Sequence, residues 1–146
     1  MDAKLLTRHF VVTATLGLPT HLHLESLTLS NGHVFGADSS TLPVDVSGGS
    51  TLVTGGNFTG TNLSFYNNSA TLYGGALALV AGDSGEPARA HLSACSFLKN
   101  KVGILATDKL HRGGGVQVIR SELSGESLHF EGNSACGSLQ PFFCSD

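Results

Sequence analysis

Histidines and charged residues are the side chains of this sequence whose types could support chemistry. Two of the seven histidines, His21 and His23, are separated by one residue, so on a β-strand both imidazoles would project from one face. Such a pair suits Zn²⁺, but a zinc site needs at least one further ligand, and none lies nearby in the sequence. We therefore interpret these histidines as exposed polar positions and predict no metal site.

Charged residues that could bind or cleave a sugar chain lie in two long segments, 33–47 and 101–112, on either side of a short segment that ends at Tyr73. If the three segments lie in adjacent layers, the short one leaves a notch between two longer loops. An aromatic floor with charged walls can bind carbohydrate. The candidate residues of this notch are Tyr73, Asp38, Asp45, Asp108, Lys109, His111 and Arg112.

The element that must position these side chains is a repeat of about 33 residues. A pattern of an apolar residue, a polar residue, Leu or Phe, two spacers and then Asn or Gly occurs at 27–32, 63–68, 95–100 and 128–133. Its third positions are separated by 36, 32 and 33 residues. This near-constant spacing predicts structural repeats that stack on one another.

Short strands with a two-residue period fill each repeat. Glycine pairs followed by alternating small or apolar residues open three of them, at 48–52, 74–79 and 113–118. A further strand precedes two copies of the pattern, at 22–24 and 90–92, and the apolar spacing after it changes from two to three. We expect a bend at each change, and hence three strands per repeat in triangular coils.

The predicted fold class is all-β, a single-stranded right-handed parallel β-helix (solenoid) of about four coils. Residues 1–146 would form one domain, with 1–21 as an N-terminal cap or edge strand, 22–136 as the coils and 137–146 as a C-terminal cap. Equivalent side chains would stack at intervals of about 4.8 Å. The expected core column is Leu29, Phe65, Phe97 and Phe130, and the expected amide column is Asn68, Asn100 and Asn133. The glycine pairs are expected in tight turns with positive φ.

The composition argues against two classes of partner. The net charge is −3 and the eight Lys and Arg residues are scattered, so no basic field for nucleic acid is present. No apolar run reaches the ~18 residues of a transmembrane helix. Met1–Leu18 only weakly resembles a signal peptide.

The three cysteines cannot all pair with one another. Cys95 occupies the inward position equivalent to Leu63, so we expect it to be a buried apolar residue rather than a reactive thiol. Cys136 and Cys144 are close enough in sequence to close a small loop. A disulfide between them is compatible with the sequence but is not required by it.

Two of these motifs resemble a known family. Phe-x-x-Asn at 65–68, 97–100 and 130–133, alternating with Gly74-Gly75-Ala76-Leu77, resembles the repeats of chlamydial polymorphic outer membrane proteins. More broadly, the pattern is similar to that of pectate-lyase-like and autotransporter passenger proteins. The resemblance covers about residues 22–136 and implies a β-helix at the cell surface or outside the cell. Polygalacturonase-like enzymes, which share this fold, carry characteristic sets of acidic and basic active-site residues. These sets are missing from this sequence.

Three functions are compatible with these sequence features. The preferred one is a non-catalytic, adhesin-like surface module that presents its flank to a glycan or a protein, without a cofactor, although Ca²⁺ is left open. The second is a polysaccharide lyase or hydrolase of the pectate-lyase-like class, with Asp108 and Arg112 carrying the chemistry. The third is a truncated fragment of a longer surface protein.

Overall fold

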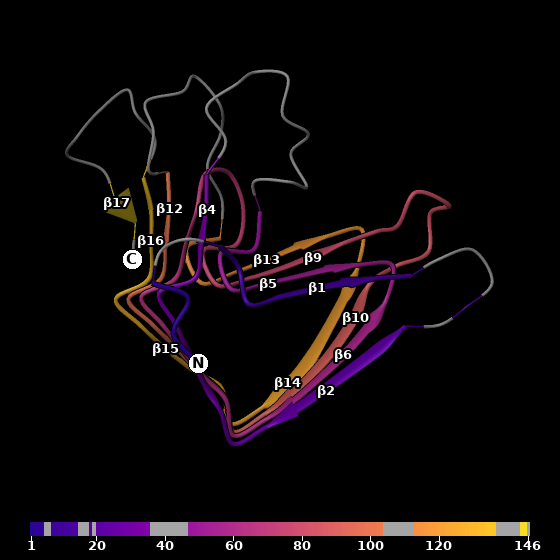
Figure 1. Ribbon diagram of the computed structural model, residues 1–146, viewed down its shortest axis with the longest axis horizontal. Coiled ribbons are helices and arrows are strands. Elements are labelled where there is room, and N and C mark those ends of the chain that lie inside the picture. The colour runs from indigo at the N-terminus through magenta and orange to yellow at the C-terminus, as the bar shows by residue number, and fades with distance from the viewer. Residues whose placement is uncertain are drawn as a thin grey trace.

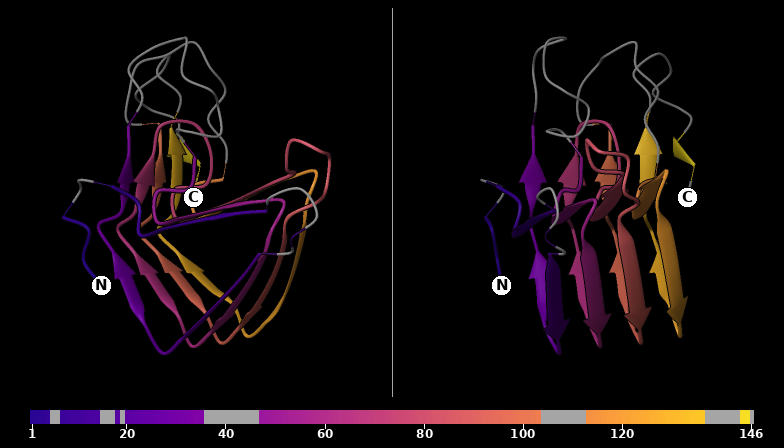
Figure 2. Two further views of the ribbon diagram at one scale, coloured as in Figure 1. Left: turned by 45° about the vertical axis from the view of Figure 1, so that its right-hand side comes forward. Right: turned by 90° about the vertical axis from the view of Figure 1, so that its right-hand side faces the viewer.

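The chain winds into stacked coils of short β-strands. The structure is a computed structural model that describes residues 1–4, 7–14, 18, 20–35, 47–103, 113–136 and 144–145. Those residues contain no helix, and therefore no helix that could cross a membrane. Equivalent strands of successive coils pair in parallel, as the side-by-side ribbons of Figures 1 and 2 show. The architecture is an all-β parallel β-helix of about four coils. Its right-handed sense stays a prediction.

Each coil contributes one strand to each of four sheets. The first sheet contains β1 (Phe10–Thr13), β5 (Thr51–Thr54), β9 (Leu77–Val80) and β13 (Val116–Ile119). The second sheet contains β2 (His21–Glu25), β6 (Asn57–Thr61), β10 (Arg89–Ser93) and β14 (Glu122–Glu126). The third sheet contains β3 (Thr28–Ser30), β7 (Ser64–Tyr66), β11 (Ser96–Leu98) and β15 (His129–Glu131). The fourth sheet contains β4 (His33–Val34), β8 (Ser69–Ala70), β12 (Lys101–Val102), β16 (Ser134–Cys136) and β17 (Cys144–Ser145).

The fourth sheet corrects the expectation of three strands per coil. Its strands in the first three coils are only two residues long, so they have no recognisable side-chain period. They follow directly after the corner that holds the asparagine column, where the chain resumes parallel pairing before it enters a loop. The other three sheets form the triangular section seen in Figure 1.

The bends between the second and third sheets lie where the apolar spacing changes. After Leu24 and Leu92 the chain turns at Ser26 and Ala94, which adopt φ of 55° and 51°. The same corner of the other two coils holds Asn62 and Ser127, also at positive φ. A left-handed residue at each corner allows the next strand to start in a new direction, at a cost of about 1 kcal/mol for a non-glycine residue. The predicted bends are therefore confirmed.

Glycines precede three of the four strands of the first sheet, β5, β9 and β13. Gly48, Gly74 and Gly113 have φ of 66°, 58° and 66°, a conformation that glycine adopts without steric cost. Gly75 follows one of these turns, and a Cβ at this position would lie 2.1 Å from the backbone oxygen of Gly114. The glycine pairs thus serve the turn and the close approach of successive coils.

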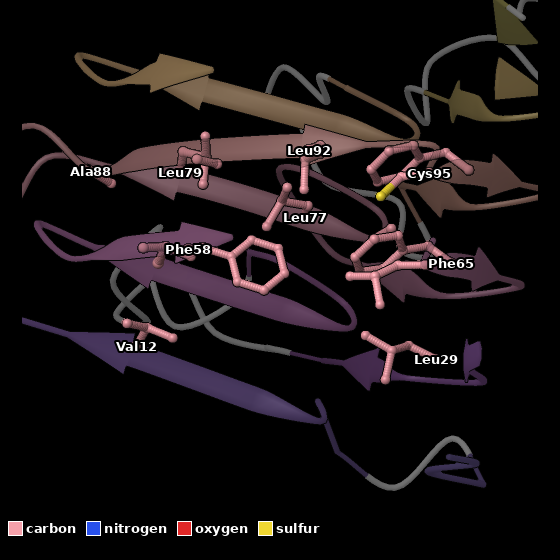
Figure 3. Packing of buried hydrophobic residues seen from close by; sticks show 14 residues of the cluster. Val12, Leu29, Phe58, Phe65, Leu77, Leu79, Ala88, Leu92 and Cys95 are labelled. Carbon is pink, nitrogen blue, oxygen red and sulfur yellow. The ribbon is translucent and has the colours of Figure 1, made fainter. Parts of the chain in front are cut away.

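Apolar side chains fill the interior in columns (Figure 3). Leu29 pairs with Phe65, Phe65 with Phe97 and Phe97 with Phe130, at the separations of the sequence repeat. The rings of Phe65 and Phe97 stack with centroids 4.7 Å apart, and those of Phe97 and Phe130 with centroids 4.9 Å apart. Burial of each inner ring contributes roughly 1.5 to 3 kcal/mol. Phe130 is 50% exposed, unlike the inner rings, because no described strand pairs with the outer edge of β15.

Asparagine amides form the second column, at the corner between the third and fourth sheets. Asn100 Oδ1 accepts hydrogen bonds from the backbone N–H and from Nδ2 of Asn68, both at 3.0 Å. Asn100 Nδ2 donates to the carbonyl of Phe65 at 3.0 Å and to Asn133 Oδ1 at 2.9 Å. Asn68 and Asn100 are fully buried, and these bonds use the Oδ1 and both Nδ2 hydrogens of Asn100. The column therefore joins successive coils through side-chain hydrogen bonds.

Candidate functional site

The outer surface of the second sheet gathers polar side chains from all four coils. Successive residues of a strand point to opposite sides, so the first, third and fifth residues of each strand face outward. We call this surface the polar face. Its residues are His21, His23, Glu25, Asn57, Thr59, Thr61, Arg89, His91, Ser93, Glu122, Ser124 and Glu126.

Hydrogen bonds between neighbouring coils hold several of these side chains in place. His21 Nε2 lies 2.9 Å from Thr59 Oγ1, and His91 Nδ1 lies 3.0 Å from Ser124 Oγ. Two further contacts join the third and fourth coils. Arg89 Nε donates to Glu122 Oε2 at 3.0 Å, and Ser93 Oγ donates to Glu126 Oε1 at 3.1 Å. These exposed contacts add little stability, but they limit the orientations of the groups that face solvent.

The polar face is hollowed along the first halves of its four strands. An open hollow of about 570 Å³ is lined by polar residues and by three apolar ones, Phe58, Ala90 and Leu123. Its polar lining consists of His21, Asn57, Thr59, Arg89, His91, Glu122 and Ser124. This volume lies within the range of about 300 to 1,000 Å³ found for small-molecule sites.

The positions of the two histidines can be compared with the needs of a zinc site within the described part of the chain. His21 and His23 lie on one face of β2, as the spacing predicts. Among the described residues, no group of three or more His, Cys, Asp or Glu side chains is arranged to hold a metal ion. The hydrogen-bonding partner of His21 Nε2 is the hydroxyl of Thr59, which is not a usual zinc ligand.

Only one residue of the predicted notch lies in the described part of the chain. Tyr73 is half-buried, packs against Val34 and Leu72, and pairs through its backbone with Ser47. The other candidates lie outside the described residues: Asp38, Asp45, Asp108, Lys109, His111 and Arg112. The notch as a ligand-binding site stays a prediction, as does the chemistry assigned to Asp108 and Arg112.

The sequence reasoning missed most of the polar face. It placed strands at 22–24 and 90–92 but none at the equivalent positions of the second and fourth coils. The repeat separations of 36, 32 and 33 residues carry His23 to Thr59, then to His91 and Ser124. Applying the same repeat separations to the strands at 22–24 and 90–92 could have identified Thr59, Arg89 and Glu122 from the sequence alone.

An exposed aromatic ring lies on the neighbouring third sheet. Tyr66, at the end of β7, is 40% exposed, and Lys99 Nζ lies 5.9 Å from its ring centroid. A cation at this distance from a ring is weakly attracted to its face. The ring offers an apolar platform on a different side of the coil from the hollow.

Cys95 is a buried structural residue. Its side chain is 1% exposed and unpaired, and Sγ lies 3.3 Å from the carbonyl oxygen of Ser93. Burial raises the pKa of this thiol, so it stays protonated and unreactive at neutral pH. The expectation that it is a buried apolar residue is confirmed.

Comparison with protein families identifies one repeat that runs from the second coil into the first strand of the third. Residues 62–79 match the Chlamydia polymorphic membrane protein (Chlamydia_PMP) repeat. The matched segment contains Phe65-x-x-Asn68 and Gly74-Gly75-Ala76-Leu77, the motifs on which the resemblance rested. No curated protein and no solved structure gives a significant match to the chain. The chain therefore contains a segment similar to this repeat, within a parallel β-helix.

Proposed function

We propose that the chain is a non-catalytic, adhesin-like module of a cell surface that binds a glycan through the polar face. The matched repeat supports a surface location, since its family is described as a membrane protein family. The observation that carries the binding role is the hollow on the second sheet, where side chains of successive coils form regular rows.

The chemistry of the rows suits sugar hydroxyls, which both donate and accept hydrogen bonds. Thr59 and Ser124 supply hydroxyls, Asn57 an amide, and His91 an imidazole. Arg89 and Glu122 add one donor and one acceptor of opposite charge, so this pair does not favour a strongly charged ligand. Because parallel strands repeat about every 4.8 Å, a linear polymer lying along a row could meet one polar side chain from each coil.

The test is a glycan-array assay on the purified chain, with calcium present and absent, and with released reducing or unsaturated ends measured in parallel. His91→Ala and Arg89→Ala should each weaken binding about fivefold to tenfold, as expected for the loss of one hydrogen bond worth ~1 kcal/mol. His129→Ala is the matched control, because His129 is an exposed histidine on the third sheet.

Four outcomes would contradict the proposal. One is the absence of binding to any glycan by a chain that is folded. Another is an equal loss of binding in His91→Ala and His129→Ala, which would mean that the polar face has no special role. Turnover of a polysaccharide would instead favour the enzyme function, and loss of binding in Tyr66→Ala alone would move the site to the third sheet.

A further inference from the structure

Two of the three cysteines lie opposite each other at the C-terminal edge of the fourth sheet. Strand β17 pairs with β16 in the antiparallel sense, whereas all the other described strand pairs are parallel. The register places Cys136 opposite Cys144 and Ala135 opposite Ser145. The chain therefore returns along its last coil and brings two cysteines, eight positions apart, to one point of the ladder.

The backbone separation at such a point suits a disulfide. Directly opposed residues of an antiparallel pair have Cα atoms about 4.5 or 5.5 Å apart, depending on whether they exchange hydrogen bonds. Disulfides join Cα atoms about 4.4 to 6.8 Å apart. Either type of opposed position therefore lies within the range of the bond without movement of the strands.

Cys95, the third cysteine, is badly placed to form a disulfide with Cys136 or Cys144. Cys95 is buried in the core, between β10 and β11, and makes contacts with the carbonyl oxygens of Gly60 and Ser93. To pair with either of the other two cysteines, it would have to leave the interior, where Phe58, Phe65 and Leu92 belong to the same cluster.

We propose that Cys136 and Cys144 form a disulfide that fastens β17 to the last coil. Each thiol gives up its proton and the sulfurs join, and the two electrons pass to an oxidised disulfide donor, which is reduced to two thiols. Such a bond persists in an oxidising compartment and is reduced in the cytosol. The bond would hold β17 against the outer edge of β16. That edge would otherwise be open to pairing with another chain.

The experiment counts thiols in the full chain. The folded chain is equilibrated with glutathione disulfide, quenched with acid, unfolded, alkylated and digested. We expect one alkylated cysteine, Cys95, out of the three, a mass lower by two hydrogens, and a peptide in which residues 136 and 144 are cross-linked. Reduction before quenching should give three alkylated cysteines.

A register variant is the matched control. Ala135→Cys combined with Cys136→Ala keeps three cysteines but moves one of them by one residue, to a position that faces Ser145. Neighbouring residues of a strand point to opposite faces, so we expect oxidation to slow by about tenfold or more. If this variant does not fold, Cys136→Ser serves instead, with an expected count of two alkylated cysteines under oxidising conditions.

The proposal is overturned by three alkylated cysteines in the oxidised folded chain. It is equally overturned by a cross-link that includes Cys95, by a bond formed only between two chains, or by equal oxidation rates in the native chain and a folded register variant.

Discussion

At the scale of single residues, the buried asparagines are the most demanding side chains of this molecule. An amide in an apolar interior is costly unless its donors and acceptor are all used. Asn100 meets this condition through Asn68, Asn133 and the carbonyl of Phe65, which belong to the two neighbouring coils. Asn100 is thus satisfied only when the coils on both sides are in register.

Asn100→Ala should destabilise the chain by on the order of 3 kcal/mol, because it leaves the buried Asn68 N–H without its partner and removes the hydrogen bond to the Phe65 carbonyl. Asn133→Ala should cost about half as much, since Asn133 is only half-buried and water can replace its bonds. Urea unfolding of both variants measures the difference. Equal losses would show that burial does not set the cost.

His9 is a residue whose burial makes stability depend on pH. Its Nδ1 lies 3.1 Å from Ser50 Oγ, and its buried Nε2 has no hydrogen-bond partner among the described residues. Burial lowers the pKa of His9 below its ordinary value of 6.5. The unfolded chain therefore takes up a proton at a higher pH than the folded chain.

The stability that His9 contributes should be complete above pH 6.5 and should fall as the pH drops through that value towards the lower folded pKa. We expect the thermal midpoint to decrease by a few degrees between about pH 7.5 and about pH 5.5. His9→Gln should flatten this profile. An unchanged slope in His9→Gln would assign the pH dependence to other groups.

At the scale of elements, close approach of successive strands depends on positions that lack a side chain. In the second sheet, an inward column alternates Leu24, Gly60, Leu92 and Gly125. The space over Gly60 is taken by Leu63 and Leu92, whose methyl carbons lie 2.7 and 2.9 Å from where a Cβ would stand. Large and small residues therefore interlock between coils.

Substitution of Gly75, just before β9, would test whether the first sheet also requires a position without a side chain. A Cβ there would meet backbone atoms of Gly114 and Lys101 at 2.1 to 2.7 Å, and backbone atoms cannot move aside as a flexible side chain can. Gly75→Ala should therefore cost about 3 kcal/mol or more. Gly85→Ala is the control, because nothing lies within 4 Å there and only its φ of 89° opposes the change, by about 1 kcal/mol. Similar unfolding midpoints for the two variants would contradict the close approach.

At the scale of the whole molecule, each coil contacts only the coils next to it, so the ends differ from the middle. The described strands of the second and third coils pair on both sides, while those of the fourth coil, apart from β16, pair on one side only. Burial follows the same gradient, from wholly buried Leu77 and Leu79 in β9 to half-buried Val116 and Val118 in β13.

Amide hydrogen exchange should reveal this gradient. We expect the slowest exchange in β7, β10 and β11, which pair on both sides, and faster exchange in β14 and β15. Mass spectrometry of peptides from the exchanged chain measures it. A single uniform rate along all four coils would show instead that the stack opens only as one cooperative unit.

The sequence by itself determined the coils. One repeat corresponds to one coil, and equivalent residues of adjacent coils pair, so the spacing of Leu29, Phe65, Phe97 and Phe130 specifies the register of the third sheet. The two-residue period and its interruptions before Ser26 and Ala94 specify where strands bend. These features are local or strictly periodic, which is why the sequence alone reveals them.

Only the tertiary structure decided which surface residues meet. Strands β6 and β14 hold Thr-Gly and Ser-Gly in place of the His-Leu of β2 and β10, so their apolar alternation is too weak to reveal them. The two-residue strands of the fourth sheet carry no period, and the pairing of Cys136 with Cys144 depends on an antiparallel return that the repeat does not encode. The polar face and the cysteine pair arise from contacts between separate segments of the chain, and such contacts are fixed only when the coils stack.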